Sequence, residues 1–178
     1  MAAFRVLGER EVYVGYKIRV TATQFAAPDG TEFERDVVHH PGAVGVLPLH
    51  DDGSVTLVRQ FRPPVGEEVL EIPAGLRDVD GEATIDTAAR ELTEEAGLRA
   101  EHLEHLISFC STPGMSDELV EVYVATGLHD VESALEGIEE QHLTVERMAL
   151  RDALAMVQDG RIIDAKTVIA LTLVALRR

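Results

Sequence analysis

The feature that most constrains this chain is the segment 75–98, where acidic residues recur at helical spacing. Residues 84–96 contain no proline or glycine, and alanine and leucine occupy their apolar positions, so we expect a helix there. Glu91 and Glu95 would then lie one turn apart on one face, with Glu94 on its flank. A hard divalent cation such as Mg²⁺ or Mn²⁺, which prefers oxygen ligands, would offset the repulsion among these carboxylates. The alternative from spacing alone is a solvated acidic helix face.

The end and the apolar side of this expected helix can also be read from the sequence. Apolar residues recur at the spacing of a buried stripe opposite the carboxylates: Ala88, Ala89, Leu92 and Ala96. Gly97 follows the stripe, and we expect it to end the helix in a left-handed conformation, which glycine adopts without steric cost.

Composition restricts the class of protein. The 178 residues suffice for one well-buried domain, and the 46% hydrophobic content excludes a disordered chain. A formal net charge of -16 argues against a nucleic-acid partner, because phosphate binding depends on Lys and Arg. The longest apolar-rich run, 168–176, is too short to cross a bilayer, and no signal-like apolar segment opens the chain. With Cys110 as the single cysteine, we expect a cytoplasmic protein with no membrane partner.

The N-terminal part is expected to form a β-hairpin. Apolar residues alternate over 12–25, Pro28-Asp29-Gly30 marks a turn, and 33–38 would be the returning strand. A two-stranded piece is marginal alone, so we expect it to pack on the main domain or on a second subunit.

The remaining elements predict an α+β fold. Further strands are expected at 42–49, 55–60, 69–72, 105–110, 119–125 and 143–148. One helix is expected at 150–157, and another runs from its N-cap Asp164 to Leu176, with Ile169, Leu173 and Leu176 on one apolar stripe. Because these elements are mixed without a regular βα repeat, an α/β architecture is not expected.

The acidic helix also resembles a known motif. Residues 90–98 read Arg-Glu-Leu-x-Glu-Glu-x-Gly-Leu, with Glu82 eight residues before Arg90, and this pattern resembles the Nudix box. In that family the usual spacing is Gly-x5-Glu, whereas six residues separate Gly75 from Glu82 here. The additional residue lies before the helix, so it puts the place of Glu82 in question and leaves the carboxylate face intact.

The resemblance extends beyond the box, toward the ADP-ribose pyrophosphatase subgroup. It rests on the stretch Gln-Phe-Arg-Pro-Pro-Val-Gly at 60–66, on Glu-Ile-Pro-Ala-Gly at 71–75, on Pro113 fifteen residues past Leu98, and on Gly-Met-Ser-Asp-Glu after it. The resemblance implies a mixed β-sheet sandwiched between helices. We therefore expect a Nudix hydrolase domain over 41–178 and an N-terminal strand segment over 1–40 that serves dimerisation and substrate binding.

The same resemblance implies a reaction and its metal site. Glu91, Glu94, Glu95 and the backbone carbonyl of Ala74 would hold Mg²⁺ (or Mn²⁺), and a metal-activated water would split ADP-ribose into AMP and ribose 5-phosphate. Five other motif residues would have structural roles: Gly75, Glu82, Arg90, Gly97 and Pro113. Arg90 would brace the loop through Glu82 or orient a glutamate.

Several residues are candidates for substrate binding. An arginine fork suits a diphosphate, so Arg62 and Arg59 are candidates, although Arg59 could equally form a surface salt bridge. Glu71 could bind substrate or cap the sheet edge, and Leu76 belongs to the same implied set. Arg35 could stack on adenine from a partner subunit, since N-terminal strands commonly exchange in this subgroup; neighbouring Phe33 is expected to be ordinary strand packing.

The general base is expected outside the metal face, because coordination leaves carboxylates weakly basic. The loop 137–142 contains a glycine and precedes a strand, and by resemblance Glu140 is the preferred base. Glu139 is the runner-up and Glu118 the third candidate. Two alternative functions stay open: a pyrophosphatase for GDP-mannose or a dinucleotide, and a non-catalytic nucleotide sensor. We also expect a homodimer.

Overall fold

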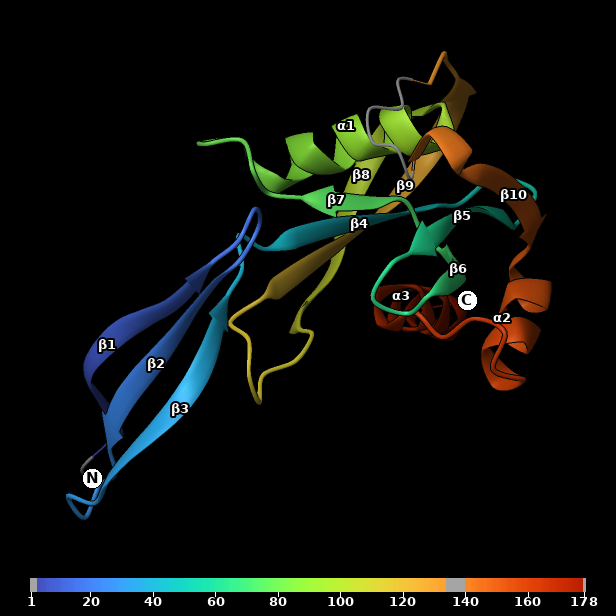
Figure 1. Ribbon diagram of the computed structural model, residues 1–178. Helices are drawn as coiled ribbons and strands as arrows, with labels where there is room; N and C mark the ends of the chain where they lie inside the picture. Colours follow the sequence, from blue (N-terminus) through green and yellow to red (C-terminus); the bar gives the residue numbers. More distant parts are fainter. Residues whose placement is uncertain (1–2, 134–139, 178) are drawn as a thin grey trace. The chain divides into compact units, whose positions relative to one another are not determined.

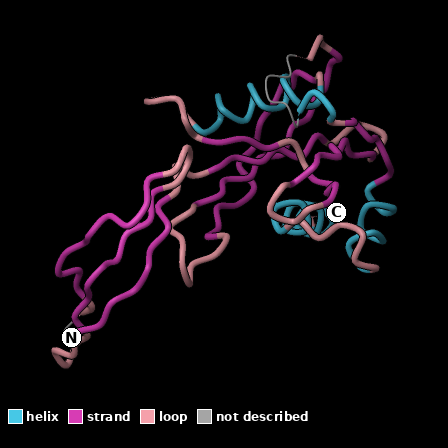
Figure 2. Tube along the Cα trace, viewed as in Figure 1, coloured by secondary structure: helices cyan, strands magenta, loops and turns pink. Residues whose placement is uncertain are grey.

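The computed structural model describes residues 3–133 and 140–177 and divides into two compact units. The first comprises Met1–Gly42 and Cys110–Leu119, and the second comprises Ala43–Phe109 and Val120–Arg178. Figures 1 and 2 show the strands and helices of each unit. The first boundary lies next to the expected division at residue 40, but the inclusion of the 110–119 segment in the first unit was not predicted.

The first unit is a three-stranded antiparallel sheet in the order β1-β2-β3, where a single hairpin was expected. Its strands are β1 (Arg5–Val14), β2 (Arg19–Ala26) and β3 (Glu32–His39). The predicted continuous strand over 12–25 is wrong, because the chain reverses after β1. The Gly15 amide donates to the Ile18 carbonyl at 2.8 Å, which closes a tight turn that the apolar alternation concealed.

The 110–119 segment is fastened to the end of β3. The Val38 amide donates to the Met115 carbonyl at 2.8 Å, and the Asp117 amide donates to the Val38 carbonyl at 3.2 Å. The Asp117 carboxylate also contacts Nδ1 of His39 at 2.6 Å. These contacts join residues that lie far apart in the sequence, so Pro113 and Glu118 belong to the first unit.

The second unit contains two sheets. One has the order β7-β4-β9-β8 and is mixed, since β4 pairs with β9 in parallel and with β7 in antiparallel register. The other has the order β10-β5-β6. The bounds of these strands are β4 (Ala43–Pro48), β5 (Ser54–Arg62), β6 (Glu67–Glu71), β7 (Ala74–Leu76), β8 (Leu98–Cys110), β9 (Leu119–Asp130) and β10 (Thr144–Ala149). Thus β8 and β9 are longer than predicted.

Helices cover both faces of β4, as Figure 1 shows. Helix α1 (Thr84–Ala96) packs with Val44 and Val46 in one apolar cluster. Helices α2 (Leu150–Gln158) and α3 (Ala165–Leu176) pack with Leu47 in the other. Successive side chains of a strand point to opposite faces, so a strand buried on both faces is apolar throughout. The predicted α+β fold with a sheet between helices is confirmed.

Two predicted helix faces need correction. Helix α1 has the predicted bounds, and Gly97 caps it at φ 62°, but Ala89 is exposed while Glu91 and Glu95 are buried. In α3 the stripe was wrong, since Leu176 is 78% exposed. Its buried residues are Thr167, Ala170, Leu171 and Val174. Helix α3 is apolar on nearly all sides, so periodicity alone did not indicate which side faces the core.

Within residues 3–133 and 140–177, no helix is long and apolar enough to span a membrane.

Candidate active site

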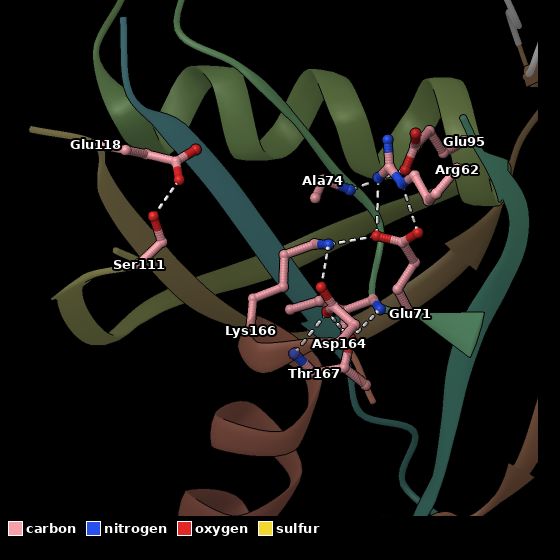
Figure 3. A network of polar contacts seen from close by, with 10 residues as sticks. Arg62, Glu71, Ala74, Glu95, Ser111, Glu118, Asp164, Lys166 and Thr167 are labelled. Carbon is pink, nitrogen blue, oxygen red and sulfur yellow. Dashed lines mark hydrogen bonds and ion pairs between the residues drawn. The ribbon is translucent and has the colours of Figure 1, made fainter. Parts of the chain in front are cut away.

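The candidate site is built where α1 meets β7. The Glu95 carboxylate accepts a hydrogen bond from the Ala74 amide at 2.8 Å, and Figure 3 shows these two groups together. A Cβ atom added to Gly75 would lie 2.0 Å from Oε1 of Glu91. Any side chain at this position would therefore force the Glu91 carboxylate to move. The motif residues Gly75 and Glu91 are thus joined by a steric requirement as well as by their spacing.

Arg90 connects the carboxylates of the helix with the preceding loop. Its Nη1 donates to Oε1 of Glu91 at 2.7 Å and to Oε2 of Glu94 at 2.8 Å. Its Nε lies 3.5 Å from Oε1 of Glu82, whose Oε2 accepts a hydrogen bond from the Thr87 hydroxyl at 2.7 Å. The additional residue before the helix therefore leaves Glu82 within reach of Arg90.

The ionisation of this cluster follows from its contacts. Burial would lower the pKa of the Arg90 guanidinium, but the charges of Glu91 and Glu94 outweigh burial and raise that pKa above its ordinary value. The hydrogen bond from Thr87, followed by the contact with Arg90, lowers the pKa of the Glu82 carboxyl. Arg90 and Glu82 are therefore both charged at neutral pH.

The donor set of this face fits a hard divalent cation. Glu91 and Glu95 are buried, Glu94 is half-buried, and all three offer oxygen atoms from neighbouring turns of α1. The absence of a side chain at Gly75 lets the Glu91 carboxylate approach the backbone of β7. In the part of the chain that the structure describes, no three His, Cys, Asp or Glu side chains are already arranged to hold a metal ion. Arg90 spans Glu91 and Glu94 in this arrangement.

Arg62 lies in a second network beside the first. Its Nε and Nη2 atoms donate to the two oxygens of Glu71 at 2.7 and 2.8 Å, a bidentate pair. Burial would lower the pKa of Arg62, but the hydrogen bonds and charge of Glu71, and then the charge of Glu95, raise it. Arg62 is therefore within electrostatic reach of Glu95 on α1.

Both carboxylate oxygens of Glu71, a predicted substrate-binding residue, accept hydrogen bonds from other side chains. Its side chain is 1% exposed, and Oε2 also accepts from Nζ of Lys166, as Figure 3 shows. Lys166 Nζ in turn contacts Oδ1 of Asp164 at 3.0 Å. Sequence reasoning missed Lys166, although it is one of only two lysines in the chain and follows the predicted N-cap Asp164.

Two further candidates lie in the second unit. Nε of Arg59 donates to Oε1 of Glu146 at 2.6 Å, which is the salt-bridge alternative considered for Arg59. Leu76 ends β7, pairs with Ala43 in register and is half-buried. The structure therefore brings Arg62 and Ala74 together with the α1 carboxylates and engages Arg59 elsewhere.

The first unit holds the remaining candidates. The Arg35 guanidinium lies 5.0 Å from the centroid of the Phe33 ring, and Phe33 stacks on Phe25 at 5.4 Å. The expected strand packing of Phe33 is confirmed. The Glu118 carboxylate accepts a hydrogen bond from the Ser111 hydroxyl and lies 3.3 Å from Nδ1 of His40. Glu118 is thus already held by two partners.

The predicted base lies at the edge of the described chain. Glu139 falls outside the described residues, and Glu140 begins the 3-10 turn η1 (Glu140–His142), with its side chain not described. Thr144 pairs with Arg59 in antiparallel register, so the chain preceding Thr144 runs toward the end of β5 that carries Arg62. The turn η1 therefore precedes β10 at the end of that strand that pairs with Arg59.

The Gly75–Glu91 contact yields a prediction. We expect Gly75→Ala to displace the Glu91 carboxylate and to lower the free energy of unfolding by about 1–3 kcal/mol, as overpacking does, measured by urea denaturation. Mn²⁺ binding, measured by electron paramagnetic resonance, should weaken as well. Gly8→Ala is the control, because a Cβ there meets nothing within 4 Å. Unchanged stability and Mn²⁺ binding in Gly75→Ala would contradict the close approach.

Known proteins resemble this chain over most of its length. The NUDIX domain family model matches residues 39–171. The chain is 36% identical over 166 residues to the methanol dehydrogenase activator of Bacillus methanolicus, covering 93% of this chain and 89% of that protein. It is 35% identical over 173 residues to the ADP-ribose pyrophosphatase of Bacillus subtilis (strain 168), covering 97% and 93%.

A solved structure shares the fold. The crystal structure of an ADP compounds hydrolase matches with a TM-score of 0.83 and 24% identity, covering 98% of this chain and 93% of that one. The family model matches more than half of the chain, and both relatives align with most of it, so the family is shown. The chain belongs to the Nudix family of hydrolases.

Proposed function

We propose that this chain is a divalent-metal-dependent pyrophosphatase that hydrolyses ADP-ribose to AMP and ribose 5-phosphate. The observation that carries the proposal is the packing of the buried Glu91 and Glu95 carboxylates against the backbone of Ala74 and Gly75. The Bacillus subtilis relative, named ADP-ribose pyrophosphatase, and the ADP compounds hydrolase with the same fold support the choice of substrate.

The proposed metal ligands are the α1 carboxylates Glu91, Glu94 and Glu95 with the Ala74 carbonyl. When bound, Mg²⁺ or Mn²⁺ would neutralise the diphosphate and make an attacking water more acidic. Arg90, which bridges Glu91 and Glu94, would hold these side chains in place and keep their mutual repulsion low.

Arg62 is the proposed diphosphate ligand. Two of its nitrogens are directed to Glu71, which fixes the plane of the guanidinium, and Glu95 acts on its charge. A planar fork held in this way recognises phosphate oxygens at low entropic cost, because its orientation is set before substrate arrives. The proton from the attacking water would pass to Glu140, the proposed general base.

The sensor alternative is disfavoured by the burial of the α1 carboxylates. Burying several carboxylates costs free energy unless partners compensate them, and a module that only binds nucleotide has no need for them. GDP-mannose and dinucleotides share the diphosphate and stay as competing substrates, since Arg62 and the α1 carboxylates would recognise all of them.

The substrate and the metal requirement can be tested together. We expect wild-type protein to release AMP and ribose 5-phosphate from ADP-ribose faster than it hydrolyses GDP-mannose or NADH, with Mg²⁺ present and not with EDTA. Glu95→Gln removes one charged oxygen at similar helix propensity and should abolish this activity. Asp86→Asn, on the exposed start of the same helix, is the control and should retain it. Activity that survives EDTA or Glu95→Gln would contradict the proposal.

The general base gives a second test. Glu140→Gln should lower kcat by about 10²–10⁴-fold, the usual contribution of a positioned base, while the affinities for Mg²⁺ and ADP-ribose change little. Glu139→Gln and Glu118→Gln are the matched comparisons and should turn over near the wild-type rate. If one of them loses kcat and Glu140→Gln does not, the base is that residue.

We also propose a cytoplasmic homodimer formed through the first unit. All ten residues of β1 are exposed, and among them are Val6 (64%), Val12 (54%) and Val14 (61%). Exposed apolar side chains of this extent on one strand mark an interaction surface. Light scattering at micromolar concentration should give the mass of a dimer, and Val12→Asp with Val14→Asp should give a monomer. A monomeric wild-type protein would overturn this proposal.

A further inference from the structure

The structure contains a buried carboxylate held by two cations, of which only one is a proposed substrate ligand. Glu71 (1% exposed) accepts hydrogen bonds from Arg62 on β5 and from Lys166 on α3. We propose that Lys166 is a positioning residue for the diphosphate site: through Glu71 it fixes the orientation of Arg62 and leaves Arg62 enough positive charge to bind a diphosphate. This inference rests on the proposed function.

The packing around Lys166 places its ammonium group at the site. The Ile72 amide donates to the Thr167 hydroxyl at 2.8 Å, which fastens the start of α3 to the residue after β6. A Cβ added to Gly45 would lie 3.6 Å from Cδ of Lys166, so the lysine stem passes over β4 at that glycine. Gly45 pairs in register with Ala74, so this stem lies over the strand next to the one that carries the proposed carbonyl ligand.

The charges explain why a second cation is needed. A carboxylate and one guanidinium that form a bidentate pair have no net charge together. Such a neutral pair attracts a diphosphate weakly. Lys166 supplies a second positive charge to Glu71, so the group of three carries a net positive charge.

Asp164 removes only part of that positive charge. Its Oδ1 contacts Lys166 at 3.0 Å, while its Oδ2 accepts from the Thr167 amide at 2.9 Å as the N-cap of α3. The partial positive charge of a helix N-terminus offsets much of the Asp164 charge. The burial of Glu71 and the low exposure of Lys166, at 13%, strengthen these interactions, because little water screens them.

A double-mutant cycle tests the proposal. Lys166→Met keeps the stem and removes the charge, and it should raise KM for ADP-ribose about tenfold with a change in kcat below about threefold. Lys166→Arg should restore KM to near the wild-type value. In the Arg62→Ala background the same Lys166→Met change should alter KM by less than about twofold, because Lys166 acts through Arg62. Lys17→Met, a change in the other, exposed lysine, is the matched control and should leave KM unaltered.

A second variant guards against loss of folding, because Lys166→Met leaves Glu71 with one cation fewer. The pair Glu71→Gln with Lys166→Met removes both charges, and thermal unfolding shows whether the fold is kept. This pair should also raise KM about tenfold, since Arg62 loses its anchor. The inference would be overturned if KM stayed within about twofold of wild type both in Lys166→Met and in the pair Glu71→Gln with Lys166→Met. Additive effects of Lys166→Met and Arg62→Ala would also overturn it. Failure of the wild-type protein to hydrolyse any diphosphate would overturn the proposed function and this inference together.

Discussion

The approach of β7 to α1 is the contact on which the candidate site depends. The Glu91 carboxylate occupies the space where residue 75 would carry a side chain, and the Ala74 amide holds Glu95. A helix carboxylate and a strand backbone come this close only where glycine removes the Cβ atom. If β7 moved away, Glu95 would lose the hydrogen bond from the Ala74 amide, and the Glu91 carboxylate would lose its close contact with the backbone of residue 75.

A second constraint joins the C-terminal helix to the same site. The N-cap Asp164, the buried Thr167 and Lys166 form one continuous network with Glu71 and the residue that follows it. Buried polar groups of this kind are stable only when every member has a partner, which makes the geometry of α3 and of Arg62 interdependent. The site is therefore supported from two helices that belong to opposite faces of β4.

Some elements were predicted correctly from the sequence and others were not, and the difference has a physical reason. Helix α1 and its Gly97 cap were correctly bounded, because propensity, period and a left-handed glycine all agree there. The N-terminal strand was wrong, since an apolar alternation on both sides of Gly15 hides a turn. The buried side of α3 was also wrong, because a helix that is apolar on nearly all sides carries no directional signal.

The sequence by itself determined the family motif, the α+β class and the helix that carries Glu91, Glu94 and Glu95, since these depend on residues close together in the chain. Only the tertiary structure decided that Glu71 is buried between Arg62 and Lys166, which lies 95 residues away, and that Arg59 pairs with Glu146, 87 residues away. Such pairs depend on how elements pack, and local periodicity carries no information about distant partners. For that reason the sequence does not reveal the role of Lys166 in the site, although it shows where the lysine lies in the chain.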